Sequence, residues 1–288
     1  MKRLSLSLLI IIVVCLGISF SHAETTTKLK IMTWNLEDMD IFDGNGTDRI
    51  LIQEKREKAI AAVIRRIDPD VMLIQEAPSL IELKYFVQSN KLPYQVAHVR
   101  NQKGRKSFSD GMAMLFKEHL SLKSISLETP AIPGSNRKPK SRYLDWSMRG
   151  LLTAQFESFV VIGVHLKSPG SSRGKAKKEL KAITTRLNQA KGLIDYADQF
   201  QVPVIIAGDF NDGPGIGDME KKHKIQDTIS TLESVFIRAP GDQPTHEKGF
   251  KIDHIMVKGG KISDKTVQNV PWILSDHRPV WTIVTLGK

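Results

Sequence analysis

The sequence is poor in cysteine: its 288 residues contain only Cys15. A single cysteine excludes an intramolecular disulfide framework and a zinc site built on several thiolates. Cys15 lies in the N-terminal apolar stretch, so the chain after that stretch has none, which suits an exported protein that does not depend on disulfides. Val13 and Val14 stand where a lipoprotein cysteine needs small residues, which argues against lipidation.

Several signature motifs are also missing. The sequence has no H-E-x-x-H motif and no Cys/His ligand spacing, which argues against a proteolytic or structural zinc site. Neither a G-x-S-x-G motif nor a Walker loop is present. No internal repeat, low-complexity block or Pro/Ser-rich linker divides the chain. We therefore predict one domain over residues 24–288, long enough for a sizeable core.

Residues 1–23 have the pattern of a secretory signal peptide. Lys2 and Arg3 form a basic start, residues 8–16 form an apolar segment, and a small-x-small site ends at Ala23. We expect cleavage near Ala23 and a secreted or periplasmic protein without stable membrane insertion afterwards. The alternative is an uncleaved anchor, but the apolar segment is shorter than the ~20 residues that a membrane span needs.

The chain is basic, with a formal net charge of +11 from 42 Lys and Arg against 31 Asp and Glu. Much of the excess lies in three runs, residues 100–106 (RNQKGRK), 137–142 (RKPKSR) and 167–181 (KSPGSSRGKAKKELK). Such runs attract polyanions such as nucleic acid, anionic lipid surfaces or phosphorylated sugars. A solvated surface is the ordinary alternative for any single run.

Hydrophobic periodicity predicts a mixture of strands and helices. Residues 60, 63, 64 and 67 are apolar at helical spacing, as are several positions in 179–197. The predicted helices are 53–67, 80–88 and 179–197. The predicted strands are 30–34, 71–74, 94–99, 111–116, 150–156, 159–165, 204–207, 252–257 and 279–284. A long Pro- and Lys-rich stretch, to which no helix or strand is assigned, follows residue 116 and reaches residue 142. Strands in hairpins and in strand–helix–strand units favour packed sheets covered by helices.

Polar residues recur at the ends of these strands, most clearly in the segment PVIIAGDFNDG at residues 203–213. There an apolar strand ends at Gly208, and Asp209 and Asn211 follow. The other strand-end residues are Asn35, Glu37, Glu76, His165, Asp253, Asp276 and His277. Each one alone has an ordinary explanation as a turn, cap, surface or core residue. Taken together, their carboxylate and amide oxygens suit a hard cation such as Mg²⁺ or Mn²⁺.

Seven short motifs carry a family resemblance. In order along the chain they are Trp34-Asn35, Gln75-Glu76, Gly111-Met112-Ala113, Val164-His165-Leu166, Gly208-Asp209-Phe210-Asn211, Ile252-Asp253-His254 and Ser275-Asp276-His277. This series resembles that of the endonuclease/exonuclease/phosphatase superfamily, which has a deoxyribonuclease-like fold. The resemblance spans residues 29–286. It implies an α/β (α+β) fold, a four-layer sandwich of two packed mixed sheets flanked by helices, and metal-dependent hydrolysis of phosphoesters.

The resemblance also implies a metal site. Glu76 takes the position of the main metal ligand, with Asn35 and Asp276 as further ligands. Glu37 lies where some members of the family have a second acidic group. The implied ion is Mg²⁺ or Mn²⁺.

Catalytic roles follow from the same resemblance. Asp209 takes the position that activates or orients the attacking water, with Asn211 beside it. His277 contacts the scissile phosphate and is oriented by Asp253. His165 serves as a phosphate ligand or general acid.

The catalytic motifs leave the substrate open. The favoured interpretation is an exported nuclease acting on DNA or RNA as a monomer, with Arg149 and Tyr143 contacting phosphate or stacking on a base. Both residues have structural explanations as well. The alternatives are a phospholipid phosphodiesterase of the sphingomyelinase kind, a phosphatase on small phosphoesters, or a non-catalytic polyanion-binding module. A lipid substrate is less favoured, because the sequence has no long apolar or aromatic hairpin that could enter a membrane. The short segment 271–273 (PWI) is only a small candidate for membrane contact.

Overall fold

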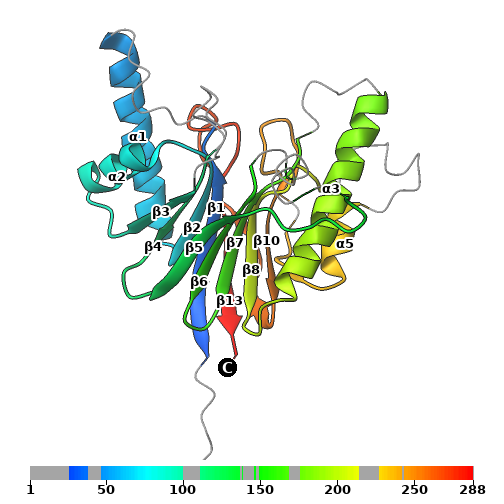
Figure 1. Cartoon of the computed structure of the whole chain (residues 1–288). Helices are drawn as coiled ribbons and strands as arrows, with labels where there is room; N and C mark the ends of the chain where they lie inside the picture. The colour runs from blue at the N-terminus through cyan, green and yellow to red at the C-terminus, as the bar shows by residue number, and fades with distance from the viewer. Residues whose placement is uncertain are drawn as a thin grey trace, which may run out of the picture.

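The protein is a sandwich of two β-sheets with helices on both outer faces (Figure 1). This computed structural model describes residues 26–37, 47–99, 111–136, 138, 146, 149–168, 176–213, 227–241 and 243–287, without the side chains of 47–53 and 176. Helices α1 (Thr47–Ile67) and α2 (Leu80–Ser89) cover one sheet. Helices α3 (Ala176–Ala197) and α5 (Thr228–Glu233) cover the other. The predicted four-layer sandwich is confirmed.

The first sheet has seven strands, in the order β11-β13-β1-β2-β4-β3 with β12 paired to β13. The strands are β1 (Thr27–Asn35), β2 (Val71–Ala77), β3 (Gln95–Val99), β4 (Gly111–Phe116), β11 (Gly260–Ile262), β12 (Thr266–Val267) and β13 (Val280–Leu286). β1 and β2 pair in parallel, joined by the crossover through α1, and the other pairs in this sheet are antiparallel.

The second sheet has six strands, in the order β5-β6-β7-β8-β10-β9. They are β5 (Leu122–Glu128), β6 (Leu151–Phe156), β7 (Val160–His165), β8 (Val204–Asp209), β9 (Ile237–Arg238) and β10 (Asp253–Lys258). β7 and β8 pair in parallel, joined through α3. Each sheet therefore has one parallel pair, and the carboxyl ends of all four of these strands lie at the upper edge in Figure 1.

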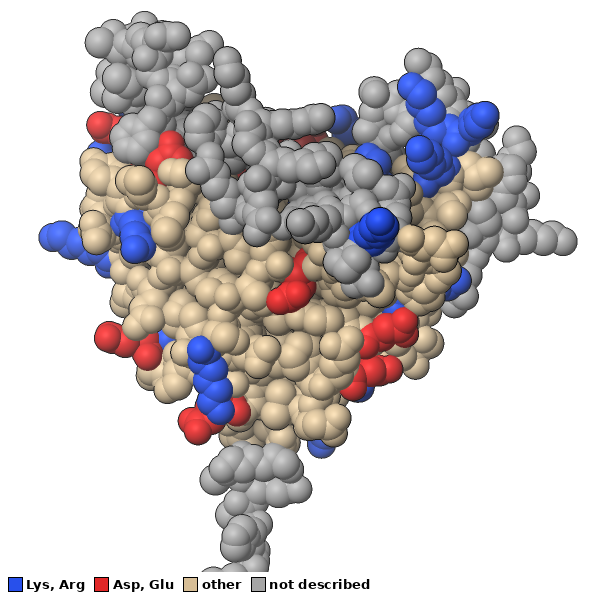
Figure 2. Space-filling model, in the orientation of Figure 1, with Lys and Arg blue, Asp and Glu red and all other residues tan. Residues whose placement is uncertain are grey.

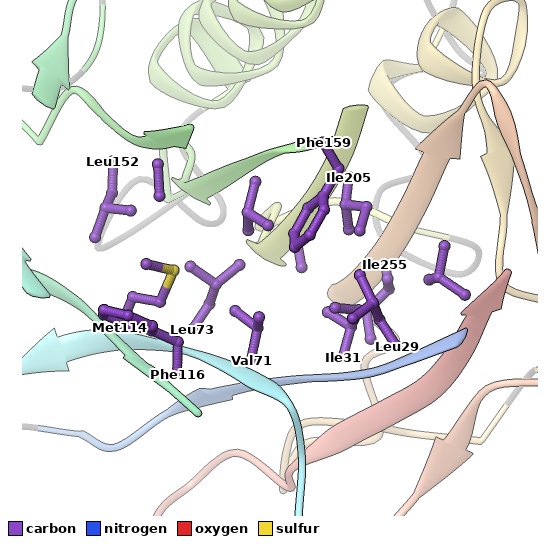
Figure 3. Close-up of a cluster of buried hydrophobic side chains, with 14 of the residues drawn as sticks. Leu29, Ile31, Val71, Leu73, Met114, Phe116, Leu152, Phe159, Ile205 and Ile255 are labelled. Carbon is purple, nitrogen blue, oxygen red and sulfur yellow. The ribbon is translucent and has the colours of Figure 1, made fainter. Parts of the chain in front are cut away.

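The main core lies between the sheets, where alternate side chains of facing strands meet (Figure 3). Leu29 and Ile31 of β1 point towards Ile205 of β8 and Ile255 of β10. The intervening residues of β1, such as Met32, pack under α1 in a second cluster. This alternation with period two explains why the inner strands are apolar on both faces. Burying each aliphatic side chain contributes about 1.5–3 kcal/mol, which makes this layer the main source of stability.

Five elements of the fold were not among those predicted from the sequence: β5, β9, β11, β12 and α5. β5 lies inside the Pro- and Lys-rich stretch that ends at residue 142, to which no element was assigned. Its burial is intermediate because it is an edge strand, so its apolar alternation is weak. Helix α5 was not predicted because it is a single short segment capped by Asp227. The predicted strands and the three longer helices are confirmed, with shifts of a few residues at their ends.

In the part of the chain that the structure describes, no helix combines the length and apolarity that crossing a membrane requires.

Candidate active site

A cavity of about 290 Å³ opens at the edge where the four parallel strands end. It brings together eight of the ten predicted site residues: Asn35, Glu76, Arg149, His165, Asp209, Asn211, Asp276 and His277. Asp253 is fully buried behind His277. Tyr143 lies outside the described residues, as do the basic runs 100–106 and most of 137–142. The tertiary structure thus joins residues from both sheets into one polar site.

Backbone irregularities direct several of these side chains into the cavity. Glu76 is the extra residue of a bulge in β2, between Gln75 and Ala77, and has a φ of 53°. The bulge leaves Glu76 half-exposed while both of its neighbours stay buried. Asn211 has a φ of 51°, a conformation that asparagine tolerates better than most residues. Glu76 and Asn211 therefore hold positions that regular strands could not provide.

Gly208 allows β8 to reach this edge in register with β7. Its φ is 152°, and a Cβ atom at this position would overlap the carbonyl oxygen of Val164. The two residues are partners in the parallel β7–β8 pair, which next aligns His165 with Asp209. Glycine at 208 thus lets both catalytic candidates face the same cavity.

The carboxylate of Asp209 is the centre of the site. Its Oδ2 accepts hydrogen bonds from Asn211 Nδ2 at 3.1 Å and from Asn35 Nδ2 at 3.4 Å. The same oxygen lies 3.4 Å from His165 Nε2 and 3.8 Å from His277 Nε2. The other oxygen, Oδ1, accepts the backbone N–H of Asn211 at 2.7 Å. Two amides and two imidazoles from four strand ends therefore converge on one buried carboxylate.

His277 is held on its far side by Asp253. The Nδ1 atom of His277 lies 2.8 Å from Asp253 Oδ2, so its Nε2 faces the cavity. Ser275 Oγ fixes the segment by donating to the carbonyl of Asn35 at 2.6 Å and accepting the N–H of His277. Trp34 Nε1 donates to the carbonyl of His277 at 2.9 Å. The end of β1 thus anchors the loop that carries His277.

His246 is a residue of the cavity that the motif series does not contain. Its Nδ1 accepts the backbone N–H of Lys248 at 3.0 Å, so a neutral ring carries its proton on Nε2. That Nε2 lies 3.4 Å from Asp276 Oδ2, and the ring packs edge-on against His277 with centroids 4.9 Å apart. His246 therefore orients Asp276. The sequence signal was Thr245-His246 before a turn at Gly249, but nothing in a single sequence ties that dipeptide to the cavity.

Charge and burial shift the acidities of these groups in different directions. Burial lowers the pKa of His165 well below its usual value, with the charges of Arg149 and His277 acting the same way, so His165 is neutral. Burial also lowers the pKa of His277, but the Asp253, Asp209 and Asp276 carboxylates outweigh it and raise this pKa to about 10. One neutral imidazole and one imidazolium therefore face each other across Asp209.

Burial raises the pKa of the Asp209 carboxyl, and the charge of Asp253 adds to this effect. The nearby His277 imidazolium and the hydrogen bond from the Asn211 backbone oppose it. Asp276 behaves differently, because the hydrogen bond and charge of His246 and the charge of His277 outweigh its burial and lower its pKa. Asp209 thus has the more basic carboxylate, as a proton acceptor requires.

The sequence model of the Endonuclease/Exonuclease/phosphatase family matches residues 32–277, most of the chain. The chain belongs to the endonuclease/exonuclease/phosphatase family. Members of this family are generally hydrolases acting on phosphoester bonds. The match includes every catalytic and metal-binding candidate named above. No curated protein matches the chain in sequence.

Solved structures with this fold come from several organisms. An endonuclease/exonuclease/phosphatase from Bacteroides vulgatus superposes with a TM-score of 0.63 at 17% identity, covering 90% of this chain and 99% of its own. A functionally unknown conserved protein from Enterococcus faecalis V583 has a TM-score of 0.59 at 18% identity, covering 90% and 100%. Truncated TDP2 from Caenorhabditis elegans has a TM-score of 0.55 at 16% identity, covering 89% and 97%. At these identities the likeness shows the fold.

Family enzymes of this kind are typically dependent on a divalent metal, and the residues present fit one. Glu76 Oε1 and Asp209 Oδ2 both approach Asn35 Nδ2, at 3.3 and 3.4 Å, so two carboxylates meet at one amide. Glu37 Oε2 accepts the backbone N–H of Asp276 at 2.9 Å, which brings two more carboxylates to the same cavity. Such a collection of oxygen donors matches a hard cation. His246, Asp276 and His277 also form a group that can hold a metal.

The loops behind the cavity are tied together by buried polar groups. Asn211 Nδ2 donates to the carbonyl of Leu166 at 3.2 Å, which joins the loops after β8 and β7. Arg186 of α3, 1% exposed, donates to the carbonyl of Lys167 at 3.1 Å and faces Asp212 Oδ2 at 3.4 Å. Asp212 also accepts the backbone N–H of Thr228 at the start of α5. The second sheet's part of the site is therefore braced from behind by both helices.

Proposed function

We propose that the protein is an exported, divalent-metal-dependent phosphodiesterase that hydrolyses DNA or RNA. The convergence of two histidines and two amides on the buried Asp209 carboxylate carries the proposal, because it assembles a proton acceptor and phosphate-binding groups in one cavity. Asn35, Glu76 and Asp276 are the proposed metal ligands. A divalent cation, Mg²⁺ or Mn²⁺, would supply Lewis-acid polarisation of the phosphate at this site.

Each of these side chains has a different role in hydrolysis. Asp209 accepts the proton of the water whose oxygen attacks phosphorus, and Asn211 holds that carboxylate in place. His277, kept cationic by Asp253, donates from Nε2 to a phosphate oxygen as negative charge develops. The neutral His165 donates a second hydrogen bond to the phosphate. The P–O bond to the leaving oxygen breaks as that oxygen takes a proton from water.

Positive charge around the cavity supports a nucleic-acid substrate. Arg149 lies in the cavity wall, where its charge acts on His165 and Asp209. Exposed Lys177, Lys178 and Lys181 occupy the first turns of α3, at the edge where the strands end. Figure 2 shows a group of Lys and Arg side chains at the upper right, where Figure 1 places this end of α3. Such groups can contact the phosphates of an extended strand, so activity is expected to fall steeply as salt is added.

The deciding experiment is nicking of supercoiled plasmid by residues 24–288, which contain every described helix and strand. Nicking is expected with Mg²⁺ and is expected to disappear with EDTA. Glu76→Ala is the control for contaminating nuclease and should lose the Mg²⁺-dependent activity as well. Absence of nicking with Mg²⁺ and Mn²⁺ would overturn the nuclease assignment and turn attention to phospholipids and small phosphoesters as substrates.

Export is tested separately. The proposal rests on the basic, apolar and small-residue segments of residues 1–23. N-terminal sequencing of protein expressed with a C-terminal tag is expected to begin at Glu24, in the medium or the periplasm. A chain that keeps Met1 and stays with the cytoplasmic fraction would contradict it.

A further inference from the structure

A second and larger hollow lies beside α1, away from the catalytic residues. Its volume is about 640 Å³, and it runs between α1 and the segment that joins β12 to β13. We call it the α1 groove. Its lining residues are Lys55, Arg56, Ala59, Ala62, Val63, Arg66, Asn269, Val270, Pro271, Ile273 and Leu274.

The sequence of α1 explains why the groove is open. Ile60, Ile64 and Ile67 point inward and are buried under the first sheet. Ala59 and Ala62 lie on the neighbouring stripe, where their short side chains leave the space that a larger residue would fill. The facing wall comes from the loop after β12, whose Ile273 is 79% exposed. The result is an apolar channel that no described side chain of this protein covers.

Cations flank this apolar floor. Lys55 and Arg66 lie at opposite ends of the α1 stripe, and none of the described lining residues is acidic. Arg56 forms part of the wall through hydrogen bonds to the carbonyls of Leu274 at 2.9 Å and Leu36 at 2.6 Å. Next to Ile273 in the chain, the Trp272 ring lies 4.2 Å from the guanidinium of Arg278. The groove therefore matches a partner with an apolar body and an anionic end.

We propose that the α1 groove takes an acyl chain of an anionic phospholipid and docks the protein on a negatively charged bilayer surface. An exposed isoleucine beside a tryptophan and basic residues is the arrangement that stabilises proteins at the lipid–water boundary. The apolar floor gives a nucleic-acid backbone nothing to bind, whereas acyl chains fill it and lipid phosphates pair with Lys55 and Arg66. The charge complementarity thus favours an anionic lipid over a nucleic acid.

The groove and the catalytic cavity share a wall. Arg56 binds the carbonyls of Leu36 and Glu37, and Glu37 lines the cavity. Leu274 lies in the groove two residues before Asp276, which lies in the cavity. Docking through the groove would therefore hold the active-site edge close to the bilayer without using any catalytic side chain.

The test is flotation of residues 24–288 with vesicles of phosphatidylcholine alone and with vesicles containing roughly equal parts of phosphatidylglycerol. Selective binding to the anionic vesicles is expected. Ile273→Ser is expected to weaken this binding about tenfold, since an apolar side chain no longer leaves water. Arg66→Gln is expected to weaken it about fivefold through loss of one charge near the surface.

Matched controls come from the opposite part of the molecule. Ile237→Ser removes an isoleucine that is 55% exposed on β9, and Lys123→Gln removes an exposed charge on β5. Both controls should bind anionic vesicles like the unmodified protein, and circular dichroism should confirm that all four variants are folded. Equal binding to neutral vesicles, no vesicle binding, or groove variants that bind as well as the controls would each overturn the proposal. Binding of an acidic amphipathic peptide in place of vesicles would do the same.

Discussion

Two hollows in the described part of the chain contrast in size and chemistry. The α1 groove is about 640 Å³ and mostly apolar, whereas the catalytic cavity is about 290 Å³ and lined by carboxylates, imidazoles and amides. The largest apolar pocket is the usual first guess for an active site. Here it is the smaller hollow that holds the groups able to move protons and bind phosphate. Size therefore identifies a surface that can bind apolar groups, and convergent polar groups identify the chemistry.

The contrast follows from how each hollow is built. Strand ends form the cavity, and adjacent strands bring backbone and side-chain polar groups within hydrogen-bond distance of each other. A helix flank and a loop form the groove, where the backbone of the helix is already satisfied and only side chains face outward. Polar networks thus gather at the sheet edge, and apolar contact surface remains on the helix.

The largest expected effect is on the rate of plasmid nicking, which should depend on the catalytic cavity and not on the α1 groove. Asp209→Asn or His277→Ala should lower the plasmid-nicking rate about 10²–10⁴-fold, because each removes a proton acceptor or a charged donor. Binding to anionic vesicles should not change in either variant. Purified variants that nick plasmid at wild-type rates would show that the cavity is not the catalytic site.

A second comparison uses the two arginines that brace the hollows. Arg186 is fully buried against Asp212 behind the cavity, and Arg56 is half-buried beside the groove. Arg186→Gln should lower the free energy of unfolding by about 3–5 kcal/mol, since it leaves Asp212 as a buried unpaired charge. Arg56→Gln should cost about 1–2 kcal/mol through lost hydrogen bonds. Urea titration of both proteins measures the difference, and equal losses would contradict it.

Acid should weaken the cavity side of the fold through His254. This ring is fully buried against Phe210, its Nε2 lies 3.0 Å from the carbonyl of Asp212, and burial with the charges of Lys265 and Arg238 lowers its pKa to about 3. The unfolded chain takes up a proton below about pH 6.5, whereas the folded chain does not until about pH 3. Above about pH 6.5 the His254 ring is neutral in both states, and the fold has its full stability. As pH falls from about 6.5 to about 3, only the unfolded chain gains this proton, so the free energy of unfolding decreases by about 1.4 kcal/mol per pH unit.

Urea unfolding of the wild type and of His254→Gln at several pH values isolates this contribution. The wild type should lose stability more steeply than the variant between about pH 6 and 4. Parallel slopes for the two proteins would show that His254 does not titrate differently in the folded and unfolded states.

The smallest expected effect is on nicking by the groove variant. Ile273→Ser should change the nicking rate of free plasmid less than about twofold, because Ile273 is 79% exposed and is not among the described residues that line the cavity. A large loss would mean that the groove and the cavity act as one site, and the contrast between them would fail.

Much of the candidate site was visible in the sequence because strand ends carry recognisable polar residues. The motif around Gly208, Asp209 and Asn211 marked the end of β8, and Glu76 marked the end of β2. His246 could not be recognised in this way. It lies in an isolated bridge to His277 within an irregular segment, where no periodic pattern marks which side chains face inward.

Other features depended on contacts that are distant in sequence. β5 is an edge strand with intermediate burial, so only its pairing with β6 identifies it. The bulge at Glu76 arises from the register between β2 and β4, and the residues of a single strand do not specify such a register. The α1 groove needs a helix stripe and a loop that lie some 200 residues apart, and neither segment alone is hollow.

The sequence by itself determined which stretches became strands and helices and which residue types stood at their ends, because apolar periodicity and glycine positions act over a few residues. Tertiary structure decided that Asn35 and Asp209, 174 residues apart, share a hydrogen bond, and that Asp253 stands behind His277. Packing the two sheets through one apolar core brought their parallel pairs to the same edge. That proximity depends on the whole folded chain, and no local pattern encodes it.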